Sequence, residues 1–134
     1  MARWLIKSEP ESYAWDDLIR DSRTEWDGVR NNAARLHLRA MKKGDEAFFY
    51  RSLVEPAIVG IVQVSRGPAP DPKNADWVSV EVKPVRALKR AVTLKAIKAE
   101  PSLAQMELIR QSRLSVAPVR DEEWTRILEM EKEA

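Results

Sequence analysis

The sequence predicts a single α+β domain in which helices flank a curved sheet or small barrel. Extended apolar segments are concentrated in the middle of the chain, whereas segments with helical periodicity lie towards its two ends. The 134 residues, 44% hydrophobic and 33% charged, are enough for one globular domain with a hydrophobic core. The sequence has no internal repeat or low-complexity segment, so we assign residues 1–134 to one domain.

The N-terminal segment is expected to form a strand followed by a helix. Residues 3–7 are mostly apolar and end before Pro10, which is typical of a short buried strand. Residues 12–20 have helical spacing, with Ser12 as the N-cap and one apolar face. That face consists of Trp15, Leu18 and Ile19.

A loop and a second helix are predicted next. Residues 23–30 contain Gly28 and show no apolar period, so we expect a loop. Asn31 is a suitable N-cap for a helix over residues 33–41, and Gly44 ends the segment.

The middle of the chain predicts the sheet. Residues 46–52 and 57–64 are apolar, β-branched or aromatic runs separated by a proline-containing turn, as in two neighbouring strands. Residues 67–74 hold three prolines and predict a loop. Residues 77–82 alternate strictly between apolar and polar side chains, and residues 85–88 form a further short strand.

Short helical and extended segments follow the sheet. Thr93 caps a helix over residues 93–99, and residues 103–110 form another helical turn or two. Residues 114–119 are extended and interrupted by Pro118.

The last predicted element is a helix over residues 121–132, capped by Asp121 and acidic in its first turn. Its inward side chains are Trp124, Ile127 and Leu128. We interpret three tryptophans as core residues: Trp4, Trp15 and Trp124.

The composition excludes several kinds of chemistry. The chain has no cysteine, which excludes disulfides, thiolate zinc sites and cysteine nucleophiles. His37 is the only histidine and lies mid-helix, where a structural role is favoured over a catalytic or metal-binding one. We therefore expect no catalytic residue, no metal site and no cofactor.

The hydropathy pattern predicts a cytoplasmic protein, with a nuclear one as the alternative, that does not interact with membranes. No segment resembles a signal peptide or a membrane span. The net charge is +2 and the pI is near 9.0. One run of cations is interpreted as a solvated face, with a phosphate-binding patch as the alternative. That run consists of Arg86, Lys89, Arg90, Lys95 and Lys98.

One enzymatic pattern is present. Pro70-Asp71 followed by Glu81-x-Lys83 matches the loose spacing of a metal-dependent PD-(D/E)xK nuclease. Glu81 and Lys83 would share one face of a strand, as a metal ligand and its lysine partner must. The pattern is short, and a turn between prolines fully explains Asp71, so we treat the nuclease as an alternative.

Three strings combine an aromatic ring or a cation with small hydrogen-bonding residues: residues 4–10, 26–32 and 113–116. Trp26 lies in a predicted loop, where its ring either closes the side of the core or stacks on a nucleic-acid base. Arg30 and Asn31 follow at a helix N-terminus, which favours anions and paired hydrogen bonds to a base edge. This set of residues is suited to holding a flat, polar ring.

In this order, the strings resemble the EVE domain family of the PUA-like superfamily. The resemblance covers nearly the whole chain, including Phe49-Tyr50 with Ser52, residues 60–64 and Trp77-Val78. It implies a PUA-like twisted β-barrel with flanking helices and no catalytic activity. It also implies a pocket for a flipped, modified base: 5-methylcytosine or 5-hydroxymethylcytosine in DNA, or a modified RNA base.

The sequence departs from the family pattern at one place. The family usually has Tyr-His-Ser-Asn where this chain has Tyr50-Arg51-Ser52-Leu53. Arg51 replaces a neutral hydrogen-bonding group with a permanent cation, which predicts a different ligand or a stronger phosphate contact.

We therefore predict a monomeric, non-catalytic module that binds nucleic acid carrying modified bases. A small-molecule or interaction module is a second alternative. Trp26 and Tyr50 are expected to stack on the base, and both should lie in one concavity. The base edge is assigned to Ser8, Glu9, Asn31 and Ser52, and the pocket rim or phosphates to Lys7, Arg30, Arg51 and Arg113, with Ser115 closing the pocket.

Overall fold

The computed structural model describes residues 2–133 and contains one six-stranded sheet in the order β2-β5-β4-β3-β1-β6. The strands are β1 (Arg3–Ser8), β2 (Thr24–Trp26), β3 (Glu46–Arg51), β4 (Ala57–Asp71), β5 (Asn74–Thr93) and β6 (Val116–Pro118). The helices are α1 (Trp15–Asp21), α2 (Asn32–Ala40), α3 (Leu94–Lys98), the 3-10 helix η1 (Pro101–Leu103), α4 (Glu107–Arg110) and α5 (Asp121–Met130). The α+β class predicted from the sequence is confirmed.

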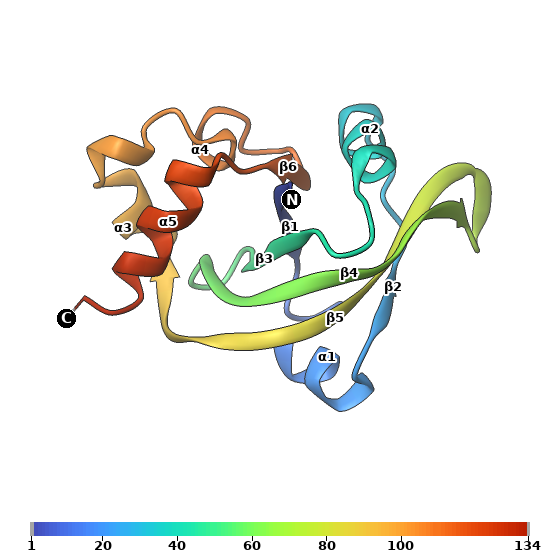
Figure 1. Cartoon of the computed structure of the whole chain (residues 1–134), viewed down its shortest axis with the longest axis horizontal. Coiled ribbons are helices and arrows are strands. Elements are labelled where there is room, and N and C mark those ends of the chain that lie inside the picture. The colour runs from blue at the N-terminus through green and yellow to red at the C-terminus, as the bar shows by residue number, and fades with distance from the viewer. Residues whose placement is uncertain (1, 134) are drawn as a thin grey trace.

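The sheet is strongly curved, as expected, but open, so the twisted barrel implied by the family resemblance is not closed. Its edges are β2 and β6, each only three residues long, and they lie at opposite ends of the strand order. Figure 1 shows β4 and β5 bending together beneath β1, β3 and β6, with α1 on one side and α3, α4 and α5 gathered at another. Curvature without closure leaves room for a cavity beside β2.

The long β4–β5 hairpin is the largest departure from the sequence prediction. Residues 67–74 were expected to form a loop, yet β4 continues to Asp71 and β5 starts at Asn74. The pairing register shifts repeatedly along this hairpin, including between Arg66 and Ala69 and between Pro70 and Asp71. These irregularities accommodate prolines, which donate no backbone hydrogen bond to a regular ladder.

Two hydrophobic clusters occupy the two faces of the sheet. Because side chains alternate along a strand, Phe49 of β3 enters one cluster and its neighbours Phe48 and Tyr50 enter the other. Trp26 lies in the cluster of Phe49, whereas Trp124 of α5 stacks on Phe48 with ring centroids 3.8 Å apart. The two faces are therefore chemically separate environments.

The helix ends confirm some caps and correct others. Asn31 and Thr93 accept hydrogen bonds from backbone N–H groups, as predicted for N-caps. The first helix begins later than expected, because Asp17 instead of Ser12 accepts a hydrogen bond at its N-terminus, from Ala14 N–H at 2.8 Å. In the last helix the capping position is Arg120, not Asp121.

Burial confirms that Trp4 and Trp124 are core residues, whereas Trp15 is only partly buried. Trp15 is half-buried and packs over Gly60, where a Cβ atom would lie 2.5 Å from its ring. Ile19, expected on the apolar face of the first helix, is exposed. The predicted loop at residues 23–30 includes β2, which pairs with β5. Within residues 2–133, no helix is both long and apolar enough to span a membrane.

Candidate functional site

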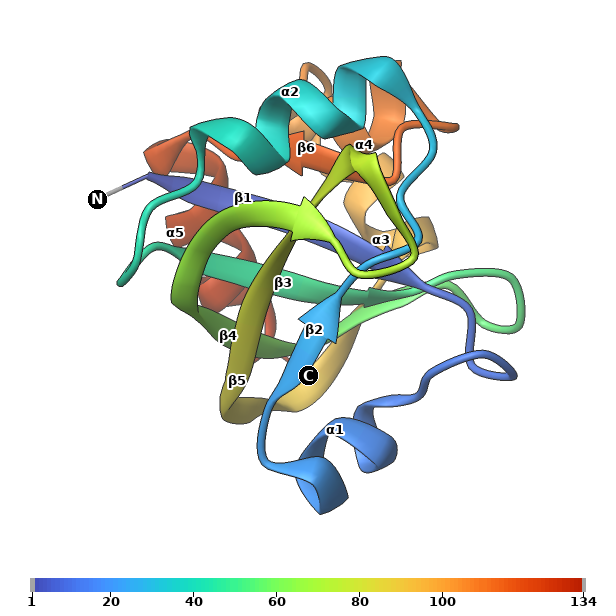
Figure 2. The same ribbon diagram turned by 90° about the vertical axis from the view of Figure 1, so that its right-hand side faces the viewer.

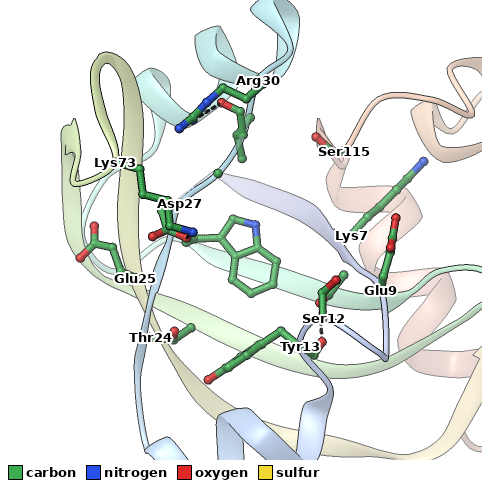
Figure 3. A pocket seen from close by; sticks show the side chains of 14 residues that line it. Lys7, Glu9, Ser12, Tyr13, Thr24, Glu25, Asp27, Arg30, Lys73 and Ser115 are labelled. Atoms are coloured by element: carbon green, nitrogen blue, oxygen red, sulfur yellow. Dashed lines mark hydrogen bonds and ion pairs between the residues drawn. The ribbon is translucent and has the colours of Figure 1, made fainter.

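A cavity of about 520 Å³ opens at the side of the sheet next to β2 (Figure 3). This volume lies in the range of roughly 300–1,000 Å³ typical of ligand pockets. Its walls come from the end of β1, the turn before α1, β2 with the segment after it, the β4–β5 turn and the residue before β6. The lining residues are Lys7, Ser8, Glu9, Ser12, Tyr13, Thr24, Glu25, Trp26, Asp27, Gly28, Val29, Arg30, Lys73 and Ser115.

Trp26 belongs to the core and to the pocket wall at once. It ends the edge strand β2 opposite Val80, and its ring makes edge-on contacts with Phe49 and Tyr13 at centroid distances of 5.7 and 6.4 Å. Only 9% of the residue is exposed, although it lines the cavity. Packing against two aromatic rings holds the indole in one orientation, so the pocket has a rigid flat wall.

The segment after Trp26 is held in place by Asp71. This buried carboxylate accepts hydrogen bonds from Gly28 N–H at 2.8 Å, Lys73 N–H at 2.7 Å and the Arg30 guanidinium at 2.9 Å. Gly28 has φ +76°, a conformation that glycine adopts without steric cost. Burial acts to raise the pKa of Asp71, but the hydrogen bonds outweigh it and lower the pKa to about 2.

We expect Asp71→Asn to lower the free energy of unfolding near pH 7 by about 1–3 kcal/mol, because an amide cannot replace all three accepted hydrogen bonds. The pKa of Asp71 is lowered on folding, so its stabilisation is complete above about pH 4 and is lost as the pH falls towards 2. The difference between wild type and variant in urea unfolding should therefore shrink on acidification. The exposed Asp76, changed to Asn, is the control; an Asp71→Asn difference that stays constant from pH 7 to pH 2 would contradict the assignment.

The remaining walls are polar, and several of their groups already have partners. The Ser8 hydroxyl donates to the carbonyl oxygen of Tyr13, and Lys7 Nζ donates to the carbonyl oxygen of Ser112 at 2.8 Å. Burial lowers the pKa of Lys7, which lies on the opposite side of the pocket from Lys73 in Figure 3.

Glu25 is the most strongly held carboxylate of the wall. The Arg66 guanidinium binds both of its oxygens at 2.8 and 2.6 Å, and the Ser79 hydroxyl donates to it as well. The hydrogen bonds from Arg66, followed by that from Ser79, lower its pKa against the opposing effect of burial. Glu25 is therefore an anion whose oxygens are largely occupied.

The structure brings together part of the predicted site. The predicted residues that line the pocket are Lys7, Ser8, Glu9, Trp26, Arg30 and Ser115. Asn31 and Arg113 instead line a separate hollow of about 390 Å³ between α2 and the segment before β6. The Ser52 hydroxyl donates to the carbonyl oxygen of Ser8 at 3.1 Å, behind the pocket wall.

Two predicted residues lie further away. Tyr50 is in the hydrophobic cluster on the opposite face of the sheet from Trp26, so the expectation that both rings share one concavity is wrong. The error arises because β3 alternates, and the face that receives Phe49 cannot receive Tyr50. Arg51 donates through Nε and Nη2 to the carbonyl oxygen of Glu55, at 3.1 and 2.9 Å.

Eight other residues line the pocket that the sequence did not indicate. Asp27, Gly28 and Val29 could have been included, since they connect two residues that were selected. Lys73 reaches the pocket only because the β4–β5 turn lies beside the segment after β2, where Lys73 pairs with Asp27, and no local pattern indicates this. The other missed residues are Ser12, Tyr13, Thr24 and Glu25.

The residues of the nuclease pattern do not assemble. Asp71 is enclosed by its three donors, whereas Glu81 accepts a hydrogen bond from the Ser65 hydroxyl at 2.8 Å. Glu81 and Lys83 line a hollow whose lining does not include Asp71. His37 packs beside Trp4, with ring centroids 5.9 Å apart. No group of three or more metal-ligating side chains occurs in the described part of the chain.

Comparison with known sequences identifies relatives over nearly the full length of the chain. The family model described as the EVE domain matches residues 2–130. Thymocyte nuclear protein 1 of Gallus gallus is 37% identical over 166 residues, covering 97% of this chain and 69% of that protein. The protein of the same name from Homo sapiens is 35% identical and covers 98% of this chain and 74% of its own length.

Solved structures share the fold. Rpa0253 from Rhodopseudomonas palustris has a TM-score of 0.93 at 46% identity, covering 97% of this chain and 92% of its own. Human THYN1, in complex with DNA containing 5-methylcytosine, has a TM-score of 0.94 at 34% identity, covering 100% and 99%. The YTH domain of Zygosaccharomyces rouxii MRB1 has a TM-score of 0.61 at 14% identity, covering 99% and 85%, and shows a likeness of fold alone. Together, the family match and the full-length similarity show that this chain belongs to the EVE domain family.

Proposed function

We propose that this chain is a non-catalytic module that binds nucleic acid by taking one modified base into the pocket beside Trp26. The observation that carries the proposal is the rigid indole wall of a polar cavity large enough for a small flat ligand. The likeness to human THYN1, whose structure contains 5-methylcytosine DNA, supports nucleic acid as the partner. The base would be 5-methylcytosine, 5-hydroxymethylcytosine or a modified RNA base.

The proposed roles follow from position. The Trp26 ring stacks on the base, as aromatic side chains do in single-strand-binding proteins. Ser8, Glu9 and Ser115 face the base edge from the wall at the end of β1, and Lys7 and Arg30 contact the sugar–phosphate backbone at the rim.

The other predicted residues act around the pocket in this proposal. Asn31 and Arg113 hold a flanking phosphate in the neighbouring hollow. Ser52 supports the wall through Ser8, Arg51 orders the loop after β3, and the Tyr50 ring lies 5.7 Å beneath Lys7 Nζ. In this proposal the base stacks on Trp26 and not on Tyr50.

The selectivity has an energetic limit. Burying one additional methyl group stabilises binding by about 0.8 kcal/mol, which is about fourfold in affinity. A polar atom that only the modified base provides can contribute more, because an unsatisfied buried partner costs about 1–3 kcal/mol. We therefore expect modest preference for a methyl mark, or a stronger preference for a mark with a hydroxyl group.

A binding panel tests this function. Otherwise identical oligonucleotides carrying cytosine, 5-methylcytosine, 5-hydroxymethylcytosine or N6-methyladenosine would be titrated at fixed salt, as DNA and as RNA. A preferred mark supports the proposal, and equal affinity for all of them contradicts it. Magnesium-dependent cleavage abolished by Glu81→Ala and unaffected by Trp26→Ala would favour the nuclease alternative.

Two further properties are predictions from the sequence. The monomeric state would be measured by light scattering of the purified chain. The predicted location is cytoplasmic, and the alternative is nuclear, as in the names of the thymocyte nuclear protein 1 relatives. Imaging of the tagged protein in its own host would decide between them.

A further inference from the structure

The connection between β3 and β4, residues 52–56, presents two apolar side chains to solvent. Leu53 is 67% exposed and Val54 is 72% exposed. Two adjacent apolar side chains that are mostly exposed are unusual on a surface rich in charge. Neither Leu53 nor Val54 packs into the hydrophobic core.

This loop is ordered in a strained conformation. Leu53 has φ +70° and Glu55 has φ +47°, in the left-handed region that residues other than glycine rarely adopt. Arg51 clamps the loop by donating two hydrogen bonds to the Glu55 carbonyl oxygen, and Pro56 accepts one from Leu94 N–H at 2.8 Å. Strain that the surrounding contacts maintain is a signal of function.

The loop is built directly onto the wall of the base pocket. Ser52 donates to the Ser8 carbonyl oxygen through both N–H, at 2.9 Å, and its hydroxyl. Because β1 and β3 are parallel with Ser8 opposite Arg51, both strands end on the same side of the sheet. Figure 2 shows the β3–β4 connection projecting beyond the end of β1. Leu53 is therefore within about 10 Å of the pocket wall, at about 3.8 Å per residue.

The surroundings of the loop favour a polyanion. A hollow of about 810 Å³ beside it is lined by Pro56, Ala91 and Leu94 together with Lys95 and Lys98. Glu55 is the single acidic side chain in the loop and in this lining. Two lysines next to an apolar tip match the phosphates and base stack of a nucleic acid, in which apolar side chains enter between base steps.

We infer that residues 52–56 form an apolar wedge that fills the space left in a duplex when one base moves into the pocket beside Trp26. The inference rests on the proposed function. It adds a second contact, between the loop and the base stack, which requires the nucleic acid to be double-stranded. A base that leaves a duplex breaks both its pairing and its stacking, whereas a base in a single strand has no pair to break and a free nucleoside has neither pair nor stack. Leu53 and Val54 should therefore matter for duplexes alone.

The test compares two double variants matched residue by residue. Leu53→Ser with Val54→Ser removes the wedge, and Leu36→Ser with Val85→Ser changes exposed residues of the same types elsewhere. Each is titrated with the oligonucleotide of the binding panel that the wild type prefers (5-methylcytosine, 5-hydroxymethylcytosine or N6-methyladenosine), as a duplex and as a single strand. The wedge variant should lose about tenfold in duplex affinity and less than twofold in single-strand affinity, whereas the control should lose neither.

Unchanged melting temperatures would show that the variants remain folded. Equal losses for duplex and single strand, or no loss for the duplex, would overturn the wedge while leaving the proposed function standing. Binding to phosphatidylserine vesicles that the wedge variant alone loses would reassign the tip to a membrane surface. Failure of the wild type to bind any oligonucleotide of the binding panel, as a duplex or as a single strand, would reject the proposed function and the wedge together.

Discussion

Trp26→Ala should weaken binding of the preferred oligonucleotide by about five- to two-hundredfold, because it removes a stack worth roughly 1–3 kcal/mol. The loss should be greatest for the preferred mark, since only that base uses the full depth of the pocket. Fluorescence anisotropy with labelled oligonucleotides at constant salt is the measurement, because phosphate contacts make affinity salt-dependent.

The core position of Trp26 requires a control for stability. The ring packs against Phe49 and Tyr13, so its truncation also removes buried contacts. Trp26→Phe keeps an aromatic face and should retain most of the affinity, whereas Trp26→Leu keeps apolar volume and should lose it. A folded Trp26→Leu protein with wild-type affinity would exclude stacking on this wall.

Trp124→Ala should have the largest effect on stability, lowering the free energy of unfolding by about 3–5 kcal/mol. Trp124 is 3% exposed, lies nearly parallel to Phe48 at 3.8 Å with an interplanar angle of 16°, and has the Arg3 guanidinium 5.0 Å from its ring. Its removal leaves a cavity between α5 and the sheet.

Urea unfolding followed by circular dichroism would give this difference, with Trp77→Ala as the control. Trp77 is a half-buried tryptophan of β5 and should cost clearly less. Since Trp124 and Trp26 lie in different hydrophobic clusters, the folded fraction of Trp124→Ala should keep its oligonucleotide affinity. A loss below about 1 kcal/mol would show that α5 contributes little to the core.

The elements with local signals were predictable. The strand around Phe49 is a continuous apolar run and the strand around Val80 alternates in apolar character. The caps at Asn31 and Thr93 depend on one side chain and a nearby backbone N–H. The loop predicted from the prolines of residues 67–74 is wrong, because shifts in strand register allow these prolines to lie within a long hairpin.

The candidate site divides along the same line. Residues 7–9 at the end of β1 and residues 26–30 line the pocket, because neighbours in sequence stay neighbours in space. Asn31 caps α2 and lines the neighbouring hollow instead. Tyr50 would line the pocket only if its side of β3 faced the same hydrophobic cluster as Trp26, and it faces the other cluster. A shift of one residue in the strand would exchange the two faces, so the sequence alone could not decide this.

The sequence by itself determined the α+β class, the strand-rich centre and the residue types suited to a flat polar ligand. Only the tertiary structure decided that the sheet stays open and that two residues more than 40 positions along the chain from Gly28 reach this site: Asp71 binds the Gly28 N–H, and Lys73 lines the pocket. Local patterns reflect backbone periodicity and hydrogen bonding between near neighbours. Contacts between distant segments depend on how the whole sheet curves, and that curvature results from packing and register over the entire chain.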